Sequence, residues 1–395
     1  MRVYFAPNGV GLGHVSRCAP VAERLEAQGD ETLFSTYLEG LTFIEESDLK
    51  YVAAPELAHK VEKDGTIDFR LTTADPGPFR SVIITLNQLG FEIQSIRDFK
   101  PNVVVSDSRA TPILAAKLLG LPSVTILNQF QVVIPRRRRL LRLAAFADMG
   151  VLTVVGRIWA LSDKILIPDF PPPYTISWNQ KIQPSYRGKI KLVGPILTTH
   201  PCQLSSKEEL RKKLGLDNRP LIFAAISGPM KEKAYFEGIL QQIFKKFPKD
   251  YQIVMTLGNP KSKRNLVRKG DFTVYHWLKN RFEYLKACDL VICRGGHGSI
   301  TQAMAYGKPM IIIPTPNHPE QATNSKRAVS LHVAKILDQE KLDLPLLLRS
   351  VEEVLGDKSI LEKVFKIERD TASIDAIETI VEEIKKSAHS LREKG

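Results

Sequence analysis

Short apolar runs alternate with amphipathic patterns of helical period along almost the whole chain. Apolar residues recur at helical spacing in Val15–Ala27 and in Ala110–Leu119, and each of these segments lies between two apolar runs. The alternation predicts βαβ units that build a parallel, doubly wound sheet. The runs expected to form its strands are Val3–Ala6, Thr32–Ser35, Val103–Ser106, Val124–Leu127 and Ile165–Ile167.

The same pattern starts again after Pro184, which indicates a second domain of the same class. We therefore predict an α/β protein with two Rossmann-like, doubly wound domains facing a cleft, at residues 1–198 and 199–370. Residues 371–395 are expected to form a C-terminal helix that packs back on the first domain. The later expected strands are Ile190–Val193, Leu221–Ile226, Ile253–Thr256, Phe272–Tyr275, Leu290–Cys293 and Met310–Pro314.

The composition is that of a folded protein. Of 395 residues, 43% are hydrophobic and 25% are charged, which supplies a core for each domain and excludes a disordered chain or a disulfide scaffold. No stretch of about 18 residues is free of charge, which excludes a polytopic membrane protein. A strand-like segment follows Met1 without an apolar signal region, so we expect a cytoplasmic protein. The scattered cysteines are expected to be reduced: Cys18, Cys202, Cys288 and Cys293.

The formal net charge of +13 indicates a polyanionic partner. Three kinds remain open at this point: nucleic acid, an anionic membrane and phosphorylated small molecules. In open α/β sheets, ligands bind in loops at the carboxyl ends of strands. The unusual residues of this sequence lie in such loops.

The first of these loops holds three glycines and a histidine, Gly9-Val10-Gly11-Leu12-Gly13-His14. Its G-x-G-x-G spacing departs from the dinucleotide-binding G-x-G-x-x-G, so a dinucleotide site is weakly supported. His14 fits a general base at the start of a helix, and the alternative is a histidine that caps the turn or packs there. Asp107 ends another expected strand and fits a carboxylate that orients His14, and its alternative role is to cap the next helix.

Two loops of the second domain suit a phosphate group. One is the glycine-rich run Arg294–Ser299, where a helix begins, and the other holds Ser227 and Gly228. Helix N-terminal amides carry partial positive charge, so the pair of loops indicates a diphosphate site. Glu320 and Gln321, after a later strand, can hydrogen-bond the hydroxyl groups of a sugar. No metal-ligand spacing links the histidines of these loops.

The segment Asp289–Asn324 resembles the donor-binding half of GT-B glycosyltransferases, especially family 28 and its MurG-type members. The loop Gly11-Leu12-Gly13-His14 resembles the family's acceptor-side loop, and Asn128-Gln129 resembles another part of that wall. The resemblance implies an acceptor-binding first domain and a nucleotide-sugar-binding second domain. The residues that carry it in the second domain are Asp289-Leu290-Val291, Arg294, Gly296, Ser299, Ala303, Gly307-Lys308-Pro309, Ile312-Ile313-Pro314, Glu320-Gln321 and Asn324.

The resemblance also implies roles for individual residues. His14 would deprotonate the acceptor hydroxyl and Asp107 would orient it, while Arg294 would neutralise phosphate or brace its loop. Gln302 stands where many relatives have a glutamate that binds the ribose. The implied donor-binding residues are Ser227, Gly228, Gly296, His297, Gly298 and Ser299, together with Tyr275, His276 and Trp277 at the base, Arg294, Gln302, and Glu320 and Gln321 at the sugar. The implied acceptor side comprises Gly11, Gly13, Asn128 and Gln129.

Four consecutive arginines, Arg136, Arg137, Arg138 and Arg139, precede an apolar helical stripe within Leu140–Leu161. Each arginine would contribute about 1 kcal/mol of attraction to anionic headgroups, and the stripe would lie in the interface. A core helix with a solvated basic start is the alternative. The resemblance favours the membrane, because MurG-like acceptor domains dock on the bilayer. Nucleic acid is disfavoured, since the run lacks interleaved aromatic residues.

We therefore expect an inverting glycosyltransferase that moves a sugar from a nucleotide-diphosphate sugar, with UDP favoured, to a lipid or lipid-linked acceptor. It would act as a peripheral protein on the inner face of the cell membrane. The nucleotide sugar would be a co-substrate, with no permanently bound cofactor and no metal. The stretch His59–Arg80 would help to shape the acceptor site. Two alternatives remain: a UDP-sugar 2-epimerase of related fold, and a non-catalytic module that binds a nucleotide sugar or a lipid.

Overall fold

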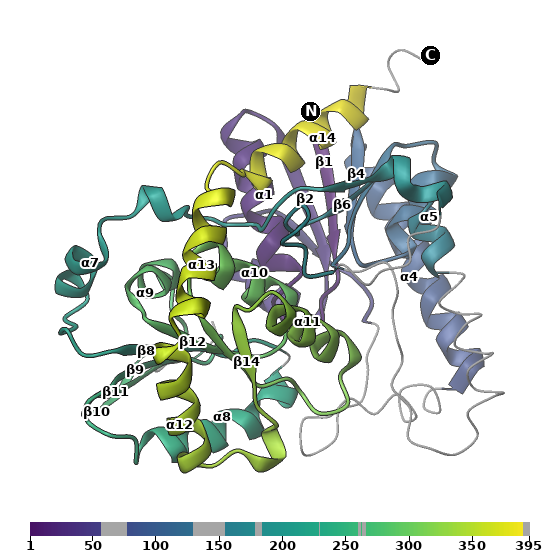
Figure 1. Cartoon of the computed structure of the whole chain (residues 1–395). Coiled ribbons are helices and arrows are strands. Elements are labelled where there is room, and N and C mark those ends of the chain that lie inside the picture. The colour runs from purple at the N-terminus through teal and green to yellow at the C-terminus, as the bar shows by residue number, and fades with distance from the viewer. Residues whose placement is uncertain are drawn as a thin grey trace.

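The computed structural model contains two β-sheets, each covered by helices on both faces (Figure 1). It describes residues 1–56, 77–128, 155–177, 184–228, 230–259, 262 and 266–389. Neighbouring strands are parallel except for one pair at the edge of the second sheet. The predicted α/β class with two doubly wound sheets is confirmed.

The N-terminal sheet has the strand order β3-β2-β1-β4-β5-β6-β7. A parallel sheet is covered on both faces, so its inner strands are continuous apolar runs. Val103, Val104 and Val105 of β4, for example, have no exposed surface. The strands are β1 (Arg2–Pro7), β2 (Glu31–Thr36), β3 (Tyr51–Ala53), β4 (Val103–Asp107), β5 (Ser123–Ile126), β6 (Lys164–Ile167) and β7 (Ile190–Leu192).

Helices from different parts of the chain cover the two faces of this sheet. On one face, α4 (Gly77–Phe99) and α5 (Thr111–Leu118) pack against the sheet through Ile96, Phe99 and Ala115, which join Tyr4 in one core cluster. On the other face, α1 (Val15–Ala27) contributes Val21 and other apolar residues to a second cluster. The short helix α2 (Leu38–Glu45) follows β2, and the 3-10 helix η1 (Pro184–Lys189) precedes β7.

The C-terminal sheet has the order β10-β11-β9-β8-β12-β13-β14. Only the pairing of β10 with β11 is antiparallel among the strands that the structure describes. The strands are β8 (Leu221–Ala225), β9 (Gln252–Thr256), β10 (Leu266–Lys269), β11 (Phe272–Tyr275), β12 (Leu290–Cys293), β13 (Met310–Ile312) and β14 (Ala334–Ile336).

The second sheet is likewise covered on both faces. Two helices, α8 (Met230–Phe244) and α12 (Leu344–Gly356), bury their apolar sides on one face, and α9 (Arg281–Ala287), α10 (His297–Ala305) and α13 (Lys358–Thr371) cover the other. Asp343 and Asp357 cap α12 and α13 with their carboxylates. The remaining elements are α7 (Lys207–Lys213), α11 (Pro319–Ser330), η2 (Pro201–Gln203) and η3 (Gln339–Lys341).

The sequence pattern did not predict the edge strands β3, β10 and β14 or the long helix α4. Edge strands are short and carry polar residues, such as Arg268 and Lys269 in β10 and Lys335 in β14, so their apolar signal is weak. The other strands lie within one or two residues of their predicted bounds.

The last helix returns to the N-terminal half. After α13, the chain crosses back and α14 (Ala376–His389) lies beside α1 (Figure 1). Ile380 and Ile384 of α14 join Val3 and Phe5 of β1 in one buried cluster. The two ends of the chain therefore stabilise the same core.

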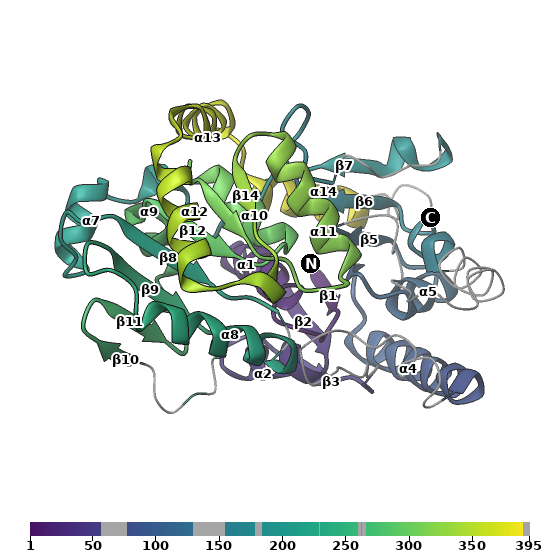
Figure 2. The ribbon, with the colours of Figure 1, turned by 60° about the horizontal axis from the view of Figure 1, so that its bottom comes forward.

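The two halves lie side by side, with α7 and β10 at one end and α4 and α5 at the other (Figure 2). Several contacts join them. The guanidinium of Arg327 in α11 donates to the carbonyl oxygens of Thr175 at 2.9 Å and Pro173 at 2.8 Å.

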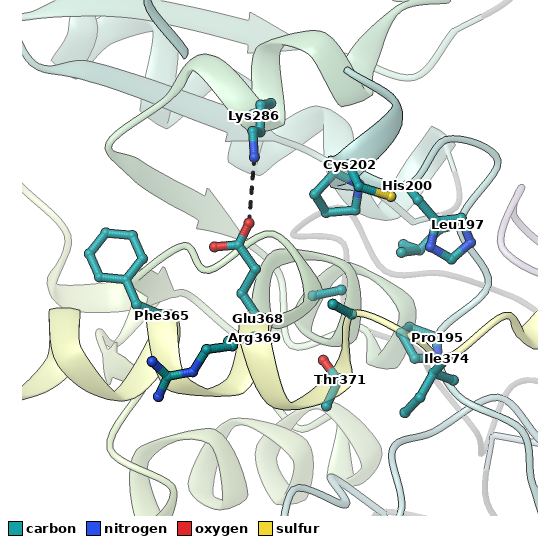
Figure 3. A pocket seen from close by; sticks show the side chains of 13 residues that line it. Pro195, Leu197, His200, Cys202, Lys286, Phe365, Glu368, Arg369, Thr371 and Ile374 are labelled. Atoms are coloured by element: carbon teal, nitrogen blue, oxygen red, sulfur yellow. Dashed lines mark ion pairs between the residues drawn. The ribbon is translucent and has the colours of Figure 1, made fainter. Parts of the chain in front are cut away.

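A cavity of about 280 Å³ lies where the chain crosses between the halves (Figure 3). Pro195 and Leu197 from the first crossing line it together with Thr371 and Ile374 from the return. None of the predicted site residues lines this cavity. Among the described helices, none combines the length and apolar character needed to span a bilayer.

Candidate active site

Each sheet has a topological switch point, from which successive strands are added toward one edge of the sheet and then toward the other. In the N-terminal sheet β1 lies between β2 and β4, and in the C-terminal sheet β8 lies between β9 and β12. Ligands of such sheets bind beyond the carboxyl ends of the strands at this point. His14 and Asp107 occupy those ends in the first sheet, and Ser227 and Ser299 occupy them in the second.

His14 and Asp107 form a hydrogen-bonded pair. Nδ1 of His14 lies 2.7 Å from Oδ1 of Asp107, and the imidazole is 23% exposed whereas the carboxylate is fully buried. His14 makes no side-chain cap to α1, and the N-cap of α5 is Ala110. The capping alternatives for His14 and Asp107 are therefore wrong.

Arg17 completes this cluster, although the sequence analysis missed it. Its Nε and one terminal nitrogen donate to the two carboxylate oxygens of Asp107, and the other terminal nitrogen donates to Oδ1 of Asn128. The only available signal was spacing, since residues three apart on a helix share a face, which places Arg17 beside His14. We call His14, Arg17, Asp107 and Asn128 the imidazole cluster.

The charges of the imidazole cluster shift the pKa of its carboxyl group. Burial alone would raise the pKa of Asp107, but the positive charges of Arg17 and His14 lower it to about 2. Burial opposes the charge of Arg17 too, but the carboxylate of Asp107 raises the pKa of its guanidinium. Asp107 is therefore an anion throughout the neutral range.

The glycine loop before His14 is held by α2. The backbone amide of Gly11 lies 3.4 Å from a carboxylate oxygen of Glu39, and Gly11 has a φ of +67°. No atom lies within 4 Å of the position that a Cβ of Gly13 would take, apart from its chain neighbours. The loop thus leaves space beside the imidazole, and Glu39 is a second residue that the sequence analysis missed.

Two hydroxyl groups meet at the switch point of the second sheet. Oγ of Ser227 lies 3.2 Å from Oγ of Ser299, although the two residues are 72 positions apart. Gly296 lies beside them, since a Cβ there would be 3.7 Å from Oγ of Ser227. Gly228 has a φ of +124°, and a Cβ on Gly298 would meet nothing within 4 Å. The hydroxyls lie at the N-terminus of α10, where backbone amides favour an anion.

The loop before α10 also contacts α11 closely. A Cβ on Gly295 would lie 2.5 Å from the carbonyl oxygen of Gln321, so only glycine fits there. The side-chain oxygen of Gln321 accepts a bond from the amide of Thr315 at 2.8 Å, and the side chain of Asn324 donates to the carbonyl oxygen of Gly295 at 3.2 Å. If Gln321 binds the sugar as predicted, the side-chain nitrogen would donate the hydrogen bond, because the side-chain oxygen already accepts one from Thr315.

The side chains of three residues of the implied donor site are packed against other parts of the protein, and for Arg294 this agrees with the bracing role, one of the two that the resemblance implies. Arg294 is 2% exposed, stacks 3.8 Å from the ring centroid of Phe236 and donates to Gln339, so it braces its loop. His297 is 2% exposed, so its imidazole is buried in the protein. The hydroxyls of Tyr275 and Tyr284 lie 2.8 Å apart, and the partly buried Tyr275 packs against the core of the second half.

His297 and Gln302 instead contact the N-terminal half. Nε2 of His297 lies 3.0 Å from Oδ2 of Asp169, and both side chains are buried. Burial opposes ionisation, but His297 and the hydrogen bonds from Ser177 lower the pKa of Asp169. The side chain of Gln302 donates to the carbonyl oxygen of Ile196 at 3.1 Å. The orientation of α10 is therefore fixed partly by the other half of the molecule.

The imidazole cluster lies close to the start of α11 in the C-terminal half. Glu320 of α11 contributes to the electrostatic environment of Arg17 in the N-terminal half. Trp277, predicted to stack on the base, makes an edge contact with Phe43 of α2 at 6.1 Å between ring centroids. The carbonyl oxygen of His276, beside it, accepts a bond from the amide of Asn259 at 2.7 Å. Gln129, Arg136, Arg137, Arg138, Arg139 and most of the stretch His59–Arg80 lie outside the described residues.

Comparison with known proteins reveals similarity over both halves. Residues 226–380 match the C-terminal domain of glycosyltransferase family 28. An uncharacterized glycosyltransferase of Methanosarcina acetivorans is 26% identical over 392 residues, which cover 96% of this chain and 97% of the relative. A UDP-N-acetylglucosamine–N-acetylmuramyl-(pentapeptide) pyrophosphoryl-undecaprenol N-acetylglucosamine transferase of Alkaliphilus metalliredigens is 28% identical over 214 residues, covering 50% of this chain and 57% of the relative.

Solved structures share the fold. The crystal structure of MurG from Acinetobacter baumannii matches with a TM-score of 0.60 and 16% identity, over 98% of this chain and 99% of that one. The match to family 28 includes the loops that carry Ser227, Ser299 and Glu320.

Proposed function

Since the chain is a glycosyltransferase with the GT-B fold and a C-terminal half like that of family 28, we propose that it is an inverting enzyme with a UDP-sugar donor. Its acceptor in this proposal is a hydroxyl group of a lipid or lipid-linked molecule at the cytoplasmic face of the membrane. The relative from Alkaliphilus metalliredigens is named for a UDP-sugar and an undecaprenol-linked acceptor, which supports both choices.

The pair formed by His14 and Asp107 is the observation that carries the proposal. Asp107 is ionised, and the N–H group at Nδ1 of His14 donates a hydrogen bond to its Oδ1, with 2.7 Å between the heavy atoms. This bond leaves the lone pair of Nε2 available to accept a proton. The imidazole of His14 is 23% exposed, compared with 11% for the side chain of Arg17 and none for Asp107, so an acceptor can reach it.

The serine pair suits the other substrate. Hydroxyls of Ser227 and Ser299, with the amides at the start of α10, would hold the diphosphate of the donor. Negative charge grows on this group as it leaves, and the N-terminal amides of the helix stabilise it. Glu320 and Gln321 would hydrogen-bond the sugar, and Trp277 would contact the base.

The reaction then follows in one displacement. The acceptor oxygen forms a bond to the anomeric carbon while the bond from that carbon to the diphosphate oxygen breaks. The proton of the acceptor hydroxyl passes to Nε2 of His14, and UDP leaves with the bonding electrons. Because attack comes from the face opposite the leaving group, the configuration at the anomeric carbon inverts.

Replacement of His14 by alanine tests the proposal. We expect kcat to fall by about 10²- to 10⁴-fold, because the general base is lost, while the Kd for the UDP-sugar stays near that of the wild type. Donor binding is measured by calorimetry over a panel of UDP-sugars, and turnover by UDP release with a polyprenyl-phosphate-linked acceptor.

His389→Ala is the matched control, since this histidine is exposed in α14. It should leave both quantities unchanged. Retention of wild-type turnover by His14→Ala, or failure of every UDP-sugar to bind, would contradict the proposed function.

A further inference from the structure

A buried lysine lies close to the loop that would hold the diphosphate of the donor. Lys233 stands near the start of α8, the helix that follows Ser227 and Gly228, and its side chain is 3% exposed. Its ammonium donates to the carbonyl oxygens of Leu257 and Gly258, the latter at 3.0 Å. A lysine is rarely buried to this degree unless its charge has partners. Lys233 therefore ties the start of α8 to the loop that follows β9.

Gly258 allows the ammonium to approach closely. It has a φ of +58°, and a Cβ there would lie 3.3 Å from Nζ of Lys233 and 3.4 Å from the carbonyl oxygen of Ile226. The ammonium and the residue before Ser227 thus lie next to the same point of the chain. A side chain at position 258 would crowd both of them.

The loop that Lys233 holds lies between two loops of the implied donor site. In the sheet, β9 pairs with β8 on one side and with β11 on the other. The loop after β8 carries Ser227, and the loop after β11 carries His276 and Trp277. The amide of Asn259, after β9, donates to the carbonyl oxygen of His276 at 2.7 Å. The loop after β9 therefore separates the predicted diphosphate contact from the predicted base contacts.

The same helix supports the loop of the second serine. Phe236 follows Lys233 by three positions, so the two side chains share a face of α8. The ring centroid of Phe236 lies 3.8 Å from the guanidinium carbon of Arg294. Arg294 donates to the carbonyl oxygen of Ile313 at 3.1 Å and begins the segment that leads to Ser299. One face of α8 thus supports the surroundings of both serines.

Two carboxylates compensate the charge of Lys233. Oε1 of Glu237, on the next turn of α8, lies 3.9 Å from its Nζ. Burial lowers the pKa of Lys233, and the carboxylates of Glu237 and Glu39 oppose this shift. Glu39 belongs to the N-terminal half, where it contacts the loop at Gly11. Removal of the ammonium would leave Glu237 without its partner on α8.

We propose that Lys233 is a positioning residue that sets the spacing between the diphosphate-binding and base-binding loops, so that the site selects a nucleoside diphosphate. This inference rests on the proposed function, in which Ser227 and Ser299 bind the diphosphate and Trp277 contacts the base. Lys233 does not touch the donor, since its ammonium is buried on two carbonyl groups. It holds two anchors for one ligand in place, and a displaced anchor loses its share of the binding free energy.

The advantage of UDP over UMP in affinity measures this spacing, because both carry the base but only UDP has the diphosphate. We expect Lys233→Met to raise the Kd of UDP about 30-fold and that of UMP less than about threefold, since misalignment costs UDP one of its two anchors. The ratio of the Kd of UMP to that of UDP should therefore fall about tenfold. Calorimetry on the full chain measures both constants without a sugar or an acceptor.

Gly258→Ala perturbs the same contact from the other side. It keeps Lys233, but the new Cβ crowds the ammonium, so the ratio should fall here too. In Lys233→Met/Gly258→Ala the two losses should be less than additive, because both variants disturb one contact.

Two controls match these variants. Gly270→Ala places a Cβ at a φ of +62° where nothing lies within 4 Å, and Lys245→Met removes an exposed lysine just after α8. Both should leave the ratio of the two Kd values unchanged.

A folded Lys233→Met protein with the wild-type ratio, including one that binds both nucleotides equally more weakly, would overturn the inference. Full additivity in the double variant would overturn it as well. If Lys233→Met does not fold, Lys233→Met/Glu237→Gln replaces it, because no buried carboxylate is then left unpaired. If neither folds, the ratio in Gly258→Ala decides. Failure of the proposed function is seen separately, in a wild-type protein that binds no UDP-sugar or in the turnover of His14→Ala.

Discussion

At the scale of single residues, one buried carboxylate is shared by three partners. Asp107 is in contact with the guanidinium of Arg17, the imidazole of His14 and the hydroxyl of Ser108. Its environment lowers its pKa from the usual 3.8 to about 2. A group with a depressed pKa stabilises the fold above its unfolded-state pKa, and this contribution is lost as the pH falls through the folded-state pKa.

Asp107→Asn should therefore destabilise the protein most at neutral pH. We expect the free energy of unfolding at pH 7 to fall by about 3–5 kcal/mol, because Arg17 is left buried without its partner. The difference from the wild type should shrink by roughly 2 kcal/mol as the pH falls from about 4 to 2, where the wild-type carboxylate becomes protonated.

Urea unfolding at a series of pH values measures this difference. Asp98→Asn is the control, since Asp98 is exposed on α4 and should cost under about 0.5 kcal/mol at any pH. A gap between Asp107→Asn and the wild type that does not depend on pH would contradict the assignment of the charge to Asp107.

At the scale of elements, a buried ion pair anchors the helix α4 to the N-terminal sheet. Glu92 of α4 and Arg109 after β4 form an ion pair with side-chain exposures of 0% and 1%. The hydroxyls of Tyr4 in β1 and Ser35 in β2 donate to the same carboxylate, at 2.8 and 2.7 Å. The network thus connects α4 to the strands at the switch point, next to the imidazole cluster.

Arg109→Met should destabilise the protein by about 3–5 kcal/mol, because it leaves the carboxylate of Glu92 buried and unpaired. Glu92→Leu added to Arg109→Met should recover part of this loss, since no lone charge then remains. Chemical denaturation measures both. Lys50→Met breaks an exposed pair with Glu31 and should change stability by less than about 1 kcal/mol. An equal cost for Arg109→Met would show that the network does not anchor α4.

At the scale of the whole molecule, the two crossings between the halves pass very close to each other. Gly194 lies on the first crossing with a φ of +90°, and a Cβ there would lie 2.1 Å from Cγ2 of Ile374 on the return. The same region lines the cavity of Figure 3. The buried pair of His297 and Asp169 joins the halves at another point. Close packing at these contacts holds the two halves in one arrangement, and with them the loops of Ser227 and Ser299 and the imidazole cluster.

Gly194→Ala should destabilise the protein more than Gly215→Ala does. Both glycines have positive φ, but a Cβ on Gly215 meets nothing within 4 Å. Backbone strain should cost each variant about 1–2 kcal/mol, and the overlap with Ile374 should cost Gly194→Ala about 1–3 kcal/mol more. Urea denaturation compares the two, and equal losses would argue against close packing of the crossings.

The sequence by itself determined the class of fold and the loops that carry the site. Inner strands of a parallel sheet are buried on both faces, so they appear as apolar runs, and the runs before His14, Asp107 and Ser299 were recognisable. These three residues follow their strands in the sequence, so they are expected at the carboxyl ends of those strands. The resemblance to family 28 also rested on a continuous segment, Asp289–Asn324.

Only the tertiary structure decided which side chains face the site. Arg17 was overlooked because its partners, Asp107 and Asn128, are distant in sequence, and His297 turned out to face Asp169 in the other half. Such pairings depend on how two sheets and their crossings pack together. A local pattern specifies the burial and period of its own element. It does not specify which charged side chain from a distant segment will contact that element in the folded protein.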